Sequence, residues 1–443
     1  MKTSAFAITG IAAGLIGLTV LLPAAKGATN APHLYHPLDV FDEALDRVHS
    51  RYVREAEDSE LVSAAINGMV SALDPHSSYM SPKEYANMQV ENRGIFGGLG
   101  LDVTLEDGLL KVVAPIDDTP AARAGIKPGD FISAIDGTIT EGMPLNEAVE
   151  RMRGPADSTV TLTLRGHGEK KAVDIVLRRA VIHVESVKYQ RKGDIGYIRI
   201  SSFTQNTDAG LTGAVTDLKK QIGPALKGYV LDLRNNPGGL LDQAIAVSDD
   251  FLTGGEVVST RGRMPEDTQR YYARSGDIAD GKPIIVLINE GTASASEIVA
   301  GALQDNHRAT ILGVTSFGKG SVQTIIPLQG SRGGALRLTT AKYYTPSGRS
   351  IQATGIAPDI AVSNLNDKDQ VDADQATSRS EASLAGHLDA EGERRTTEKR
   401  IIRPEADKSY DDFQLSYAVE QLNSNVAALL PPGKQARGLS GTR

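Results

Sequence analysis

The chain of 443 residues contains no cysteine. This absence excludes a thiol nucleophile, an iron–sulfur cluster, a cysteine-based zinc site and any disulfide bond. An excess of positive charge is also absent, because 47 Lys and Arg are outnumbered by 55 Asp and Glu, for a formal net charge of −8. A chain that binds nucleic acid needs a dense basic face for phosphate contacts, so this balance argues against a nucleic-acid partner.

Metal-ligand patterns and the familiar serine-hydrolase elbow are missing as well. The eight histidines are scattered, and neither a His-Glu-x-x-His pair nor a Gly-x-Ser-x-Gly segment occurs. Isolated histidines such as His183 and His307 are more often structural than catalytic, and nothing in their spacing indicates a Ser-His-Asp triad. The sequence therefore predicts no metal and no cofactor.

Long apolar runs are absent except at the N-terminus, where no charge lies between Lys2 and Lys26. A single positive charge, an apolar stretch rich in small residues and a short Pro-Ala-Ala-Lys-Gly-Ala segment match a secretory signal. At ~1.5 Å per residue the same stretch is long enough to cross a bilayer as one helix. We expect residues 1–28 to be a signal peptide or a membrane anchor. The remainder would work outside the cytoplasm, in the periplasm, tied to the inner membrane only if this segment is retained.

The rest of the chain changes its pattern several times. Apolar residues recur at helical spacing over residues 38–73, which predicts two amphipathic helices. Short β-like runs follow from Gly94, and from Ile195 strands and helices alternate, which indicates βαβ crossovers and a largely parallel, buried sheet. The fold class predicted is multidomain α+β, with five regions: N-terminal helices (34–92), a small β domain (93–180), an α/β core (181–365), a disordered polar linker (366–408) and a C-terminal helical tail (409–443).

The alternating region gives specific element predictions. Strands are expected at 195–200, 228–233, 283–288 and 309–314, and helices at 211–221, 240–251 and 293–303. In the tail, apolar residues recur at helical spacing over residues 413–430, which predicts a further helix.

The first candidate for chemistry is Ser294, in the segment Asn-Glu-Gly-Thr-Ala-Ser-Ala-Ser-Glu that follows the strand at 283–288. In the first turn of a helix, backbone N–H groups lack an intrahelical acceptor, and a serine attacking a carbonyl needs such donors for the oxygen that becomes negative. Ser294-x-x-Glu297 is also a capping box, in which the serine only satisfies backbone donors. On this segment alone, capping is the favoured interpretation.

Two further segments are ambiguous by themselves. The run from Gly313 to Gly320 nearly matches the phosphate-binding loop Gly-x-x-x-x-Gly-Lys-[Ser/Thr], but Gly320 stands where a hydroxyl must ligate Mg²⁺. A strand-like sequence also follows where that loop requires a helix, so nucleotide binding is disfavoured. The run from Gly228 to Gly239 ends in Pro-Gly-Gly, whose glycines let backbone N–H groups approach a ligand. Alone, it is better explained as an ordinary strand–helix connection.

Together these segments carry a family resemblance. Three motifs occur in order at compatible distances: Asp232-Leu-Arg-Asn-Asn-Pro-Gly-Gly239, Thr292-Ala-Ser-Ala-Ser-Glu-Ile298 and Phe317-Gly-Lys-Gly-Ser-Val-Gln323. They resemble the carboxyl-terminal processing peptidases, or tail-specific proteases, serine enzymes that use lysine in place of histidine. Leu73–Met80 is similar to the helical lead-in of that family and Thr119–Asp130 to its PDZ domain, so the resemblance covers roughly residues 38–362.

The resemblance implies a role for each site residue. Ser294 would be the nucleophile, Lys319 the general base and Gln323 the group that orients the lysine amine, while the amides of Gly238 and Ala295 would form the oxyanion hole. A lysine accepts a proton only when neutral, so its pKa must fall from ~10.4 toward ~7–8, and burial among apolar groups supplies that shift without a charged partner. The rival nucleophiles are Ser296 and Ser321.

Substrate selection is expected in the PDZ-like region. The segment Phe96-Gly-Gly-Leu-Gly-Leu101 resembles a carboxylate-binding loop. The backbone of Gly98, Leu99, Gly100 and Leu101 would hold a terminal carboxylate while the adjoining strand edge pairs with the peptide. The alternative is a glycine-rich loop that joins two domains. We also expect Arg153, at a predicted helix end, to pair across an interface and take part in gating.

These expectations combine into one function. The chain would be an exported serine endopeptidase that cleaves proteins near their C-termini, with substrate tails recruited by the PDZ domain. A non-catalytic PDZ scaffold and a nucleotide-binding enzyme are the alternatives from other classes. Protein or peptide substrates with exposed C-termini are the expected partners, with an adaptor protein left open. The flanking helices at 38–73 and 413–430 suggest a homo-oligomer, a dimer or larger.

Overall fold

The structure is a computed structural model that describes residues 35–106, 108–116, 118–165, 172–183, 185–329, 333–364, 380–391, 401–405 and 410–424. The predicted signal or anchor segment, residues 1–28, lies outside the described residues. No helix in the described ranges combines the length and the apolar character needed to cross a bilayer. The chain divides into two compact units, residues 1–64 and 65–443, and each is considered by itself.

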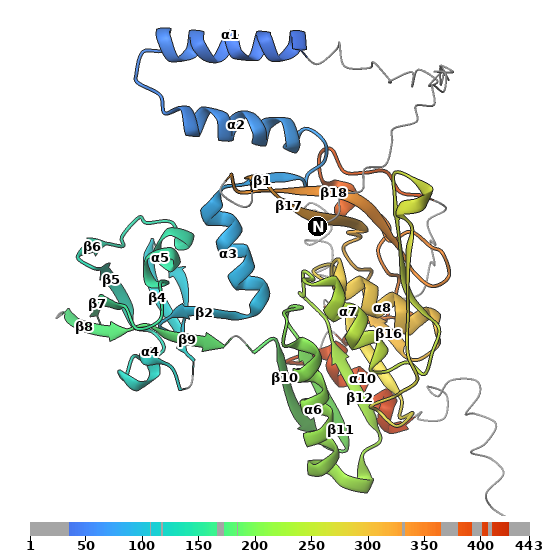
Figure 1. The fold of residues 1–443 in the computed structure, drawn as a ribbon. Coiled ribbons are helices and arrows are strands. Elements are labelled where there is room, and N and C mark those ends of the chain that lie inside the picture. Colours follow the sequence, from blue (N-terminus) through green and yellow to red (C-terminus); the bar gives the residue numbers. More distant parts are fainter. Residues whose placement is uncertain are drawn as a thin grey trace, which may run out of the picture. The chain divides into compact units, whose positions relative to one another are not determined.

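The N-terminal helices form as predicted. Helix α1 spans Tyr35–Arg51 and helix α2 spans Asp58–Ser71 (Figure 1). The apolar face that predicted helix α1 is exposed: Leu38, Phe41 and Val48 are each more than 40% exposed. No part of the described chain packs over these side chains.

The PDZ region is an antiparallel sheet closed by two short helices (Figure 1). Its core consists of fully buried side chains such as Leu110, Val112 and Leu162. Strand β3 lies at one edge of the sheet and pairs with β4. A two-stranded ribbon, β2 (Ile95–Gly98) with β9 (Ala180–His183), connects the domain at both ends. The elements are β3 (Leu101–Glu106), β4 (Leu109–Pro115), α4 (Pro120–Arg123), β5 (Phe131–Ile135), β6 (Thr138–Ile139), α5 (Leu145–Met152), β7 (Thr159–Arg165) and β8 (Val173–Arg178).

The α/β core is built on a six-stranded sheet in the order β10-β11-β12-β15-β16-β19 (Figure 1). Every pair in it is parallel except the edge pair of β10 and β11. The strands are β10 (Val187–Lys192), β11 (Ile195–Ile200), β12 (Gly228–Asp232), β15 (Ile284–Ile288), β16 (Thr310–Gly313) and β19 (Ile360–Ala361), and the helices are α6 (Thr207–Ile222), α7 (Leu241–Asp249) and α8 (Ala295–Asp305). The predicted strands and helices of this region are therefore confirmed, with ends that differ by a few residues.

Both faces of this sheet are covered, which explains its continuous apolar strands. Leu231 and Val286 pack with helices α6, α7 and α8. Their neighbours Val230 and Ile285 face the other way and pack with α10 (Phe413–Ser424). Successive side chains of a strand point to opposite faces, so a strand covered on both sides must be apolar throughout. The predicted C-terminal helix is confirmed up to Ser424, and residues 425–430 lie outside the described residues.

A second, antiparallel sheet lies beside the core and carries the strand that follows Lys319. It joins β1 (Ser78–Met80), β18 (Ala335–Tyr344), β13 (Glu256–Gly262) and β14 (Gln269–Tyr272), with β17 (Ser321–Pro327) also paired to β18. Strand β1 belongs to the lead-in that precedes the PDZ domain. This pairing brings residues 74–80 into contact with the core, through Ser77 and Asp74, which bond Thr339.

The expectation of a disordered linker over 366–408 is wrong for residues 380–391. These residues include a short helix, η4 (Glu381–Ser383), and Glu381 is fully buried. Ile402 forms a bridge with Val362. The polar composition suggested too little apolar surface for order. Buried hydrogen bonds of Glu381 with His76 and Gln352, rather than an apolar cluster, hold this segment in place.

Candidate active site

The predicted site residues lie on loops that follow three adjacent parallel strands. Gly238 comes after β12, Ser294 after β15 and Lys319 after β16, and these strands are neighbours in the sheet. Because parallel strands present their carboxyl ends at one edge, the three loops share that edge, where α/β folds place their ligands. Topology alone thus gathers motifs separated by up to 81 residues in sequence.

Ser294 has an unusual backbone conformation at the start of α8. Its φ is 56° and its ψ is −116°, which non-glycine residues rarely adopt. Such strain at a strand–helix turn is typical of functional sites. Its side chain is partly exposed, whereas Ser296 is fully buried and donates to the Asn236 carbonyl at 3.0 Å. Ser321 is also buried. Access to substrate therefore favours Ser294 over both rivals.

The two predicted oxyanion donors lie next to Ser294. A Cβ built on Gly238 would lie 2.9 Å from the Ser294 Cβ and 3.0 Å from the Ala295 nitrogen, so only glycine fits here. Ala295 is the first residue of α8, where its N–H has no intrahelical acceptor. The Gly238 N–H donates to Asn236 Oδ1 at 2.9 Å. An oxyanion would have to share or replace that bond, so the role of Gly238 stays a prediction.

One carboxylate, that of Glu297, connects the Ser294 turn to the Lys319 loop. It accepts the Ser294 N–H at 2.8 Å, the Gly318 N–H at 2.7 Å and the Lys319 N–H at 2.9 Å. The Ser316 hydroxyl is the fourth donor, at 2.5 Å. Burial raises the pKa of Glu297 to about 7, although these four hydrogen bonds act in the opposite direction. The sequence identified Glu297 only as a capping partner, and its contacts with the lysine loop were missed.

The surroundings of the Lys319 amine favour the neutral form that a general base requires. Burial has the largest effect and lowers the pKa of Lys319 below its ordinary value. Among the described residues the amine makes no hydrogen bond or ion pair. Several charges nevertheless act on it: Glu381, Glu297 and Asp74 raise its pKa and Arg337 lowers it. The expectation of a site without acidic neighbours is therefore wrong, yet the effect of burial outweighs them.

Gln323 has other partners in the structure. Its side-chain amide donates to Ser321 Oγ at 2.9 Å and to Thr339 Oγ1 at 3.3 Å. No hydrogen bond joins it to the Lys319 amine among the residues that the structure describes. Thr339 in turn donates to Asp74 at 3.0 Å, so Gln323 belongs to a polar network on the lysine side of the site. That it orients the amine remains a prediction.

The predicted peptide-binding residues of the PDZ domain gather around one pocket. Gly98, Leu99, Gly100 and Leu101 line a cavity of about 100 Å³, together with Val149 and Met152 of α5, Phe96 and Arg153. Gly100 has a φ of +75°, and a Cβ there would lie 2.3 Å from Thr119, so this turn requires glycine. The adjacent strand β3 pairs only with β4 among the described strands, which leaves an edge for an added strand.

Three parts of the chain match families of known proteins. Residues 194–362 match Peptidase family S41, residues 111–166 match the PDZ domain and residues 23–84 match the Activating protease CtpB N-terminal domain. A carboxy-terminal-processing protease of Bartonella bacilliformis is 52% identical over 406 residues, which cover 91% of this chain and 92% of the relative. The chain belongs to peptidase family S41. It is a carboxy-terminal-processing serine protease with a PDZ domain.

Other processing proteases match over shorter lengths. A carboxyl-terminal-processing protease of Synechocystis is 40% identical over 324 residues, 71% of this chain and 74% of the relative. Among solved structures, the photosystem II D1 C-terminal processing protease shares 31% identity with a TM-score of 0.43, covering 72% of this chain and 85% of that one.

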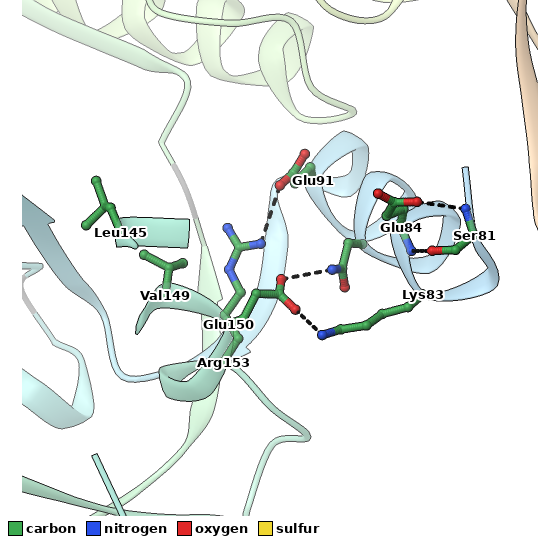
Figure 2. A pocket seen from close by; sticks show the side chains of 9 residues that line it. Ser81, Lys83, Glu84, Glu91, Leu145, Val149, Glu150 and Arg153 are labelled. Carbon is green, nitrogen blue, oxygen red and sulfur yellow. Dashed lines mark hydrogen bonds and ion pairs between the residues drawn. The ribbon is translucent and has the colours of Figure 1, made fainter. Parts of the chain in front are cut away.

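In this S41 protease, Arg153 lies between the PDZ pocket and a second cavity. Its guanidinium stacks 4.9 Å from the Phe96 ring and bonds Glu91 of α3 (Pro82–Arg93) at 3.4 Å. Figure 2 shows that second cavity, of about 890 Å³, where Glu150 of α5 also bonds Lys83 of α3. Arg153 thus bonds a residue outside the PDZ sheet, and its role in gating remains a prediction. Within the described ranges, no three His, Asp or Glu side chains gather as a metal site would need.

Proposed function

We propose that Ser294 is the nucleophile and Lys319 the general base of this protease. The Ser294 oxygen forms a bond to the scissile carbonyl carbon, its proton moves to the neutral lysine amine, and the carbonyl electron pair moves onto oxygen. The amides of Ala295 and Gly238 donate to that oxyanion. When the C–N bond breaks, the departing amine takes the proton from Lys319, and water then hydrolyses the acyl-enzyme.

A single observation carries this assignment: the Glu297 carboxylate bonds both the Ser294 amide and the Lys319 amide. The nucleophile and the base therefore belong to one buried hydrogen-bonded unit instead of two independent loops. Glu297 thereby fixes the backbone from which both side chains extend, and proton transfer requires that the Ser294 hydroxyl reach the Lys319 amine. In this proposal Gln323 assists through the Ser321 and Thr339 network.

The substrates we propose are proteins with accessible C-termini, captured first by the PDZ domain. The pocket formed by Leu101, Val149 and Met152 suits an apolar terminal side chain, and the edge of β3 suits an extended peptide. A tail held there raises the effective concentration of the same molecule at Ser294. Cleavage near the C-terminus follows from that tethering.

Export and self-association complete the proposal. The charge pattern of residues 1–28 supports export to the periplasm, and fractionation of cells that express the tagged chain tests it. The exposed apolar side chains of α1, such as Leu38 and Phe41, support a homodimer. Light scattering of the wild type and of the Leu38→Glu/Phe41→Glu variant tests that assembly.

The proposed catalytic roles are tested by incubating a tailed peptide or casein with wild type, Ser294→Ala and Lys319→Ala. Both substitutions should abolish cleavage, and neither EDTA nor ATP should alter the wild-type rate. Cleavage that survives in Ser294→Ala would move the nucleophile to another residue. A wild type without any activity would favour the non-catalytic scaffold.

A further inference from the structure

A segment far from the catalytic motifs is built into the wall of the lysine loop. Residues 380–391 lie about 60 positions after Lys319 and were expected to be part of a linker. Glu381, near the start of this segment, is 0% exposed. A carboxylate is rarely buried completely unless it is paired and fully hydrogen-bonded, so its partners indicate its purpose.

Glu381 is linked to both ends of the loop that carries Lys319, directly at Phe317 and through Gln352 at Gly320. Its backbone N–H donates to the Phe317 carbonyl at 2.9 Å. Its carboxylate accepts from the Gln352 amide at 2.9 Å, and the Gln352 oxygen in turn accepts the Gly320 N–H at 3.0 Å. Phe317 and Gly320 flank the lysine, so this residue fixes the loop before and after the base.

The lead-in to the PDZ domain supplies the remaining partner of Glu381. His76 Nε2 lies 2.8 Å from one carboxylate oxygen and 3.0 Å from the other. His76 is held by its own N–H, which donates to Asp74 at 2.9 Å. Residues from the beginning and from the end of the described chain thus meet beside the catalytic lysine.

The charges around the lysine amine come from four different elements. Glu297 lies on α8, Asp74 precedes β1, Arg337 lies on β18 and Glu381 starts the C-terminal segment. Glu297 and Asp74 are already occupied by several backbone and hydroxyl donors. Among these charges, Glu381 has the largest electrostatic effect on Lys319.

We propose that Glu381 is a positioning residue for the general base, which fixes the Phe317–Gly320 loop and stabilises the ammonium that Lys319 becomes when it accepts the Ser294 proton. This inference rests on the proposed function of Ser294 and Lys319. Burial lowers the pKa of Lys319 and so weakens its amine as a proton acceptor. A carboxylate that acts from nearby without forming an ion pair offsets part of that effect.

The test measures the lysine directly, by competitive acetylation of its amine at a series of pH values with mass spectrometry of the Lys319 peptide. The full chain carries Ser294→Ala, so that it cannot digest itself. Only the neutral amine reacts, so the midpoint of labelling gives the pKa of Lys319. Glu381→Gln should lower that midpoint by about 0.5–1 pH unit, since it removes a charge that favours the ammonium.

The matched control is Glu391→Gln, in the same segment. Glu391 bonds Lys342 and Tyr344, so its removal weakens docking of the segment without removing the charge at Lys319. Its labelling midpoint should equal that of the wild type. In the active chain, the acid limb of kcat/KM against pH should move to lower pH for Glu381→Gln and stay in place for Glu391→Gln.

Each outcome decides the proposal. An unchanged labelling midpoint in folded Glu381→Gln, or an equal shift in Glu391→Gln, would overturn it. If Glu381→Gln does not fold, Glu381→Asp and Glu381→Asn make the same comparison, because they differ only in charge, and the Asn variant must show the lower midpoint. Failure of the proposed function would be recognised separately, as cleavage that persists in Ser294→Ala.

Discussion

At the scale of single residues, the site depends on close approaches that leave no room for substitution. A Cβ on Gly238 would lie 2.9 Å from the Ser294 Cβ, and the Glu297 carboxylate accepts hydrogen bonds from four donors on two loops. These contacts define where the oxyanion forms and where the lysine loop lies. Changes of one or two atoms should therefore have large effects on catalysis and smaller effects on folding.

Gly238→Ala should lower kcat by about 10²–10³-fold, the effect expected when an oxyanion donor is lost. The added methyl group would lie 2.9 Å from the Ser294 Cβ. Gly254→Ala is the control, because Gly254 also has a positive φ, of +148°, while a Cβ there would meet no described atom within 4 Å. Steady-state kinetics and thermal unfolding of both variants separate the steric effect from backbone strain. Equal kcat in the two variants would contradict the placement of the oxyanion hole.

Asp250→Asn should stabilise the protein, and more at pH 9 than at pH 5. Burial, with Asp208 nearby, raises the pKa of Asp250 to about 8. Between about pH 4 and pH 8, the folded protein holds a proton that the unfolded chain has lost, so this carboxyl lowers stability progressively as the pH rises. Asparagine removes that dependence.

Thermal unfolding of Asp250→Asn at the two pH values measures the effect. The control is Asp242→Asn, an exposed carboxylate in the first turn of α7, the helix that ends just before Asp250, and it should keep the wild-type dependence on pH. A gain for Asp250→Asn that is the same at pH 5 and pH 9 would show that burial of this carboxyl has no energetic consequence.

At the scale of secondary-structure elements, α10 has a structural role. The C-terminal helix packs on one face of the central sheet, against β12, β15 and β16, with Ala418 and Leu422 fully buried beside Val230 and Ile285. Arg234, two residues after β12, bonds Asp412 just before α10 at 2.7 and 2.9 Å. The helix therefore completes the core of the protease on the face opposite α8.

Leu422→Ala should reduce the free energy of unfolding by about 2–4 kcal/mol, the usual cost of removing a buried leucine. Leu422 is 0% exposed, and it packs so close to β12 that a Cβ built on Gly228 would lie 3.0 Å from its Cδ2. Glu420→Ala, on the exposed side of the same helix, should change stability by less than about 0.5 kcal/mol. Urea denaturation of both variants checks this, and equal values would mean that α10 does not pack on the sheet.

The elements that carry the catalytic motifs could be predicted from the sequence, whereas two acidic residues near Lys319 could not. Apolar strand runs and glycine turns determine the parallel sheet, so the placement of Ser294 and Lys319 at one sheet edge was predictable from the motifs. Glu381 and Asp74 were not, because they come from segments at opposite ends of the described chain and reach the site through β1 pairing and buried polar contacts. Residues 380–391 contain few large apolar side chains, and their composition therefore predicted disorder. Hydrogen bonds hold this segment instead, and composition does not reveal them.

At the scale of the whole molecule, the PDZ domain and the core are linked through α3. Arg153 bonds Glu91 on α3 (Figure 2). It also contacts Phe96 and lines the peptide pocket, so one residue is shared by the pocket and the neighbouring helix. The gating hypothesis states that this contact reports occupancy of the PDZ domain to the active site.

Free peptide with an apolar C-terminus should therefore change the cleavage rate of a substrate that has no such tail, by several-fold. The effect should be lost in Arg153→Ala, because its contacts with Phe96 and Glu91 are removed. Arg123→Ala, which removes an exposed arginine of α4, is the control and should keep the response. Identical rates with and without the peptide in the wild type would end the gating hypothesis.

The central claim, that a neutral Lys319 activates Ser294, is tested most directly with a fluorophosphonate probe and peptide mass spectrometry. The account predicts one adduct, on Ser294, that forms rapidly in the wild type, is absent in Ser294→Ala and is nearly absent in Lys319→Ala. An adduct on Ser296 or Ser321, or equal labelling of Ser294 with and without the lysine amine, would contradict it.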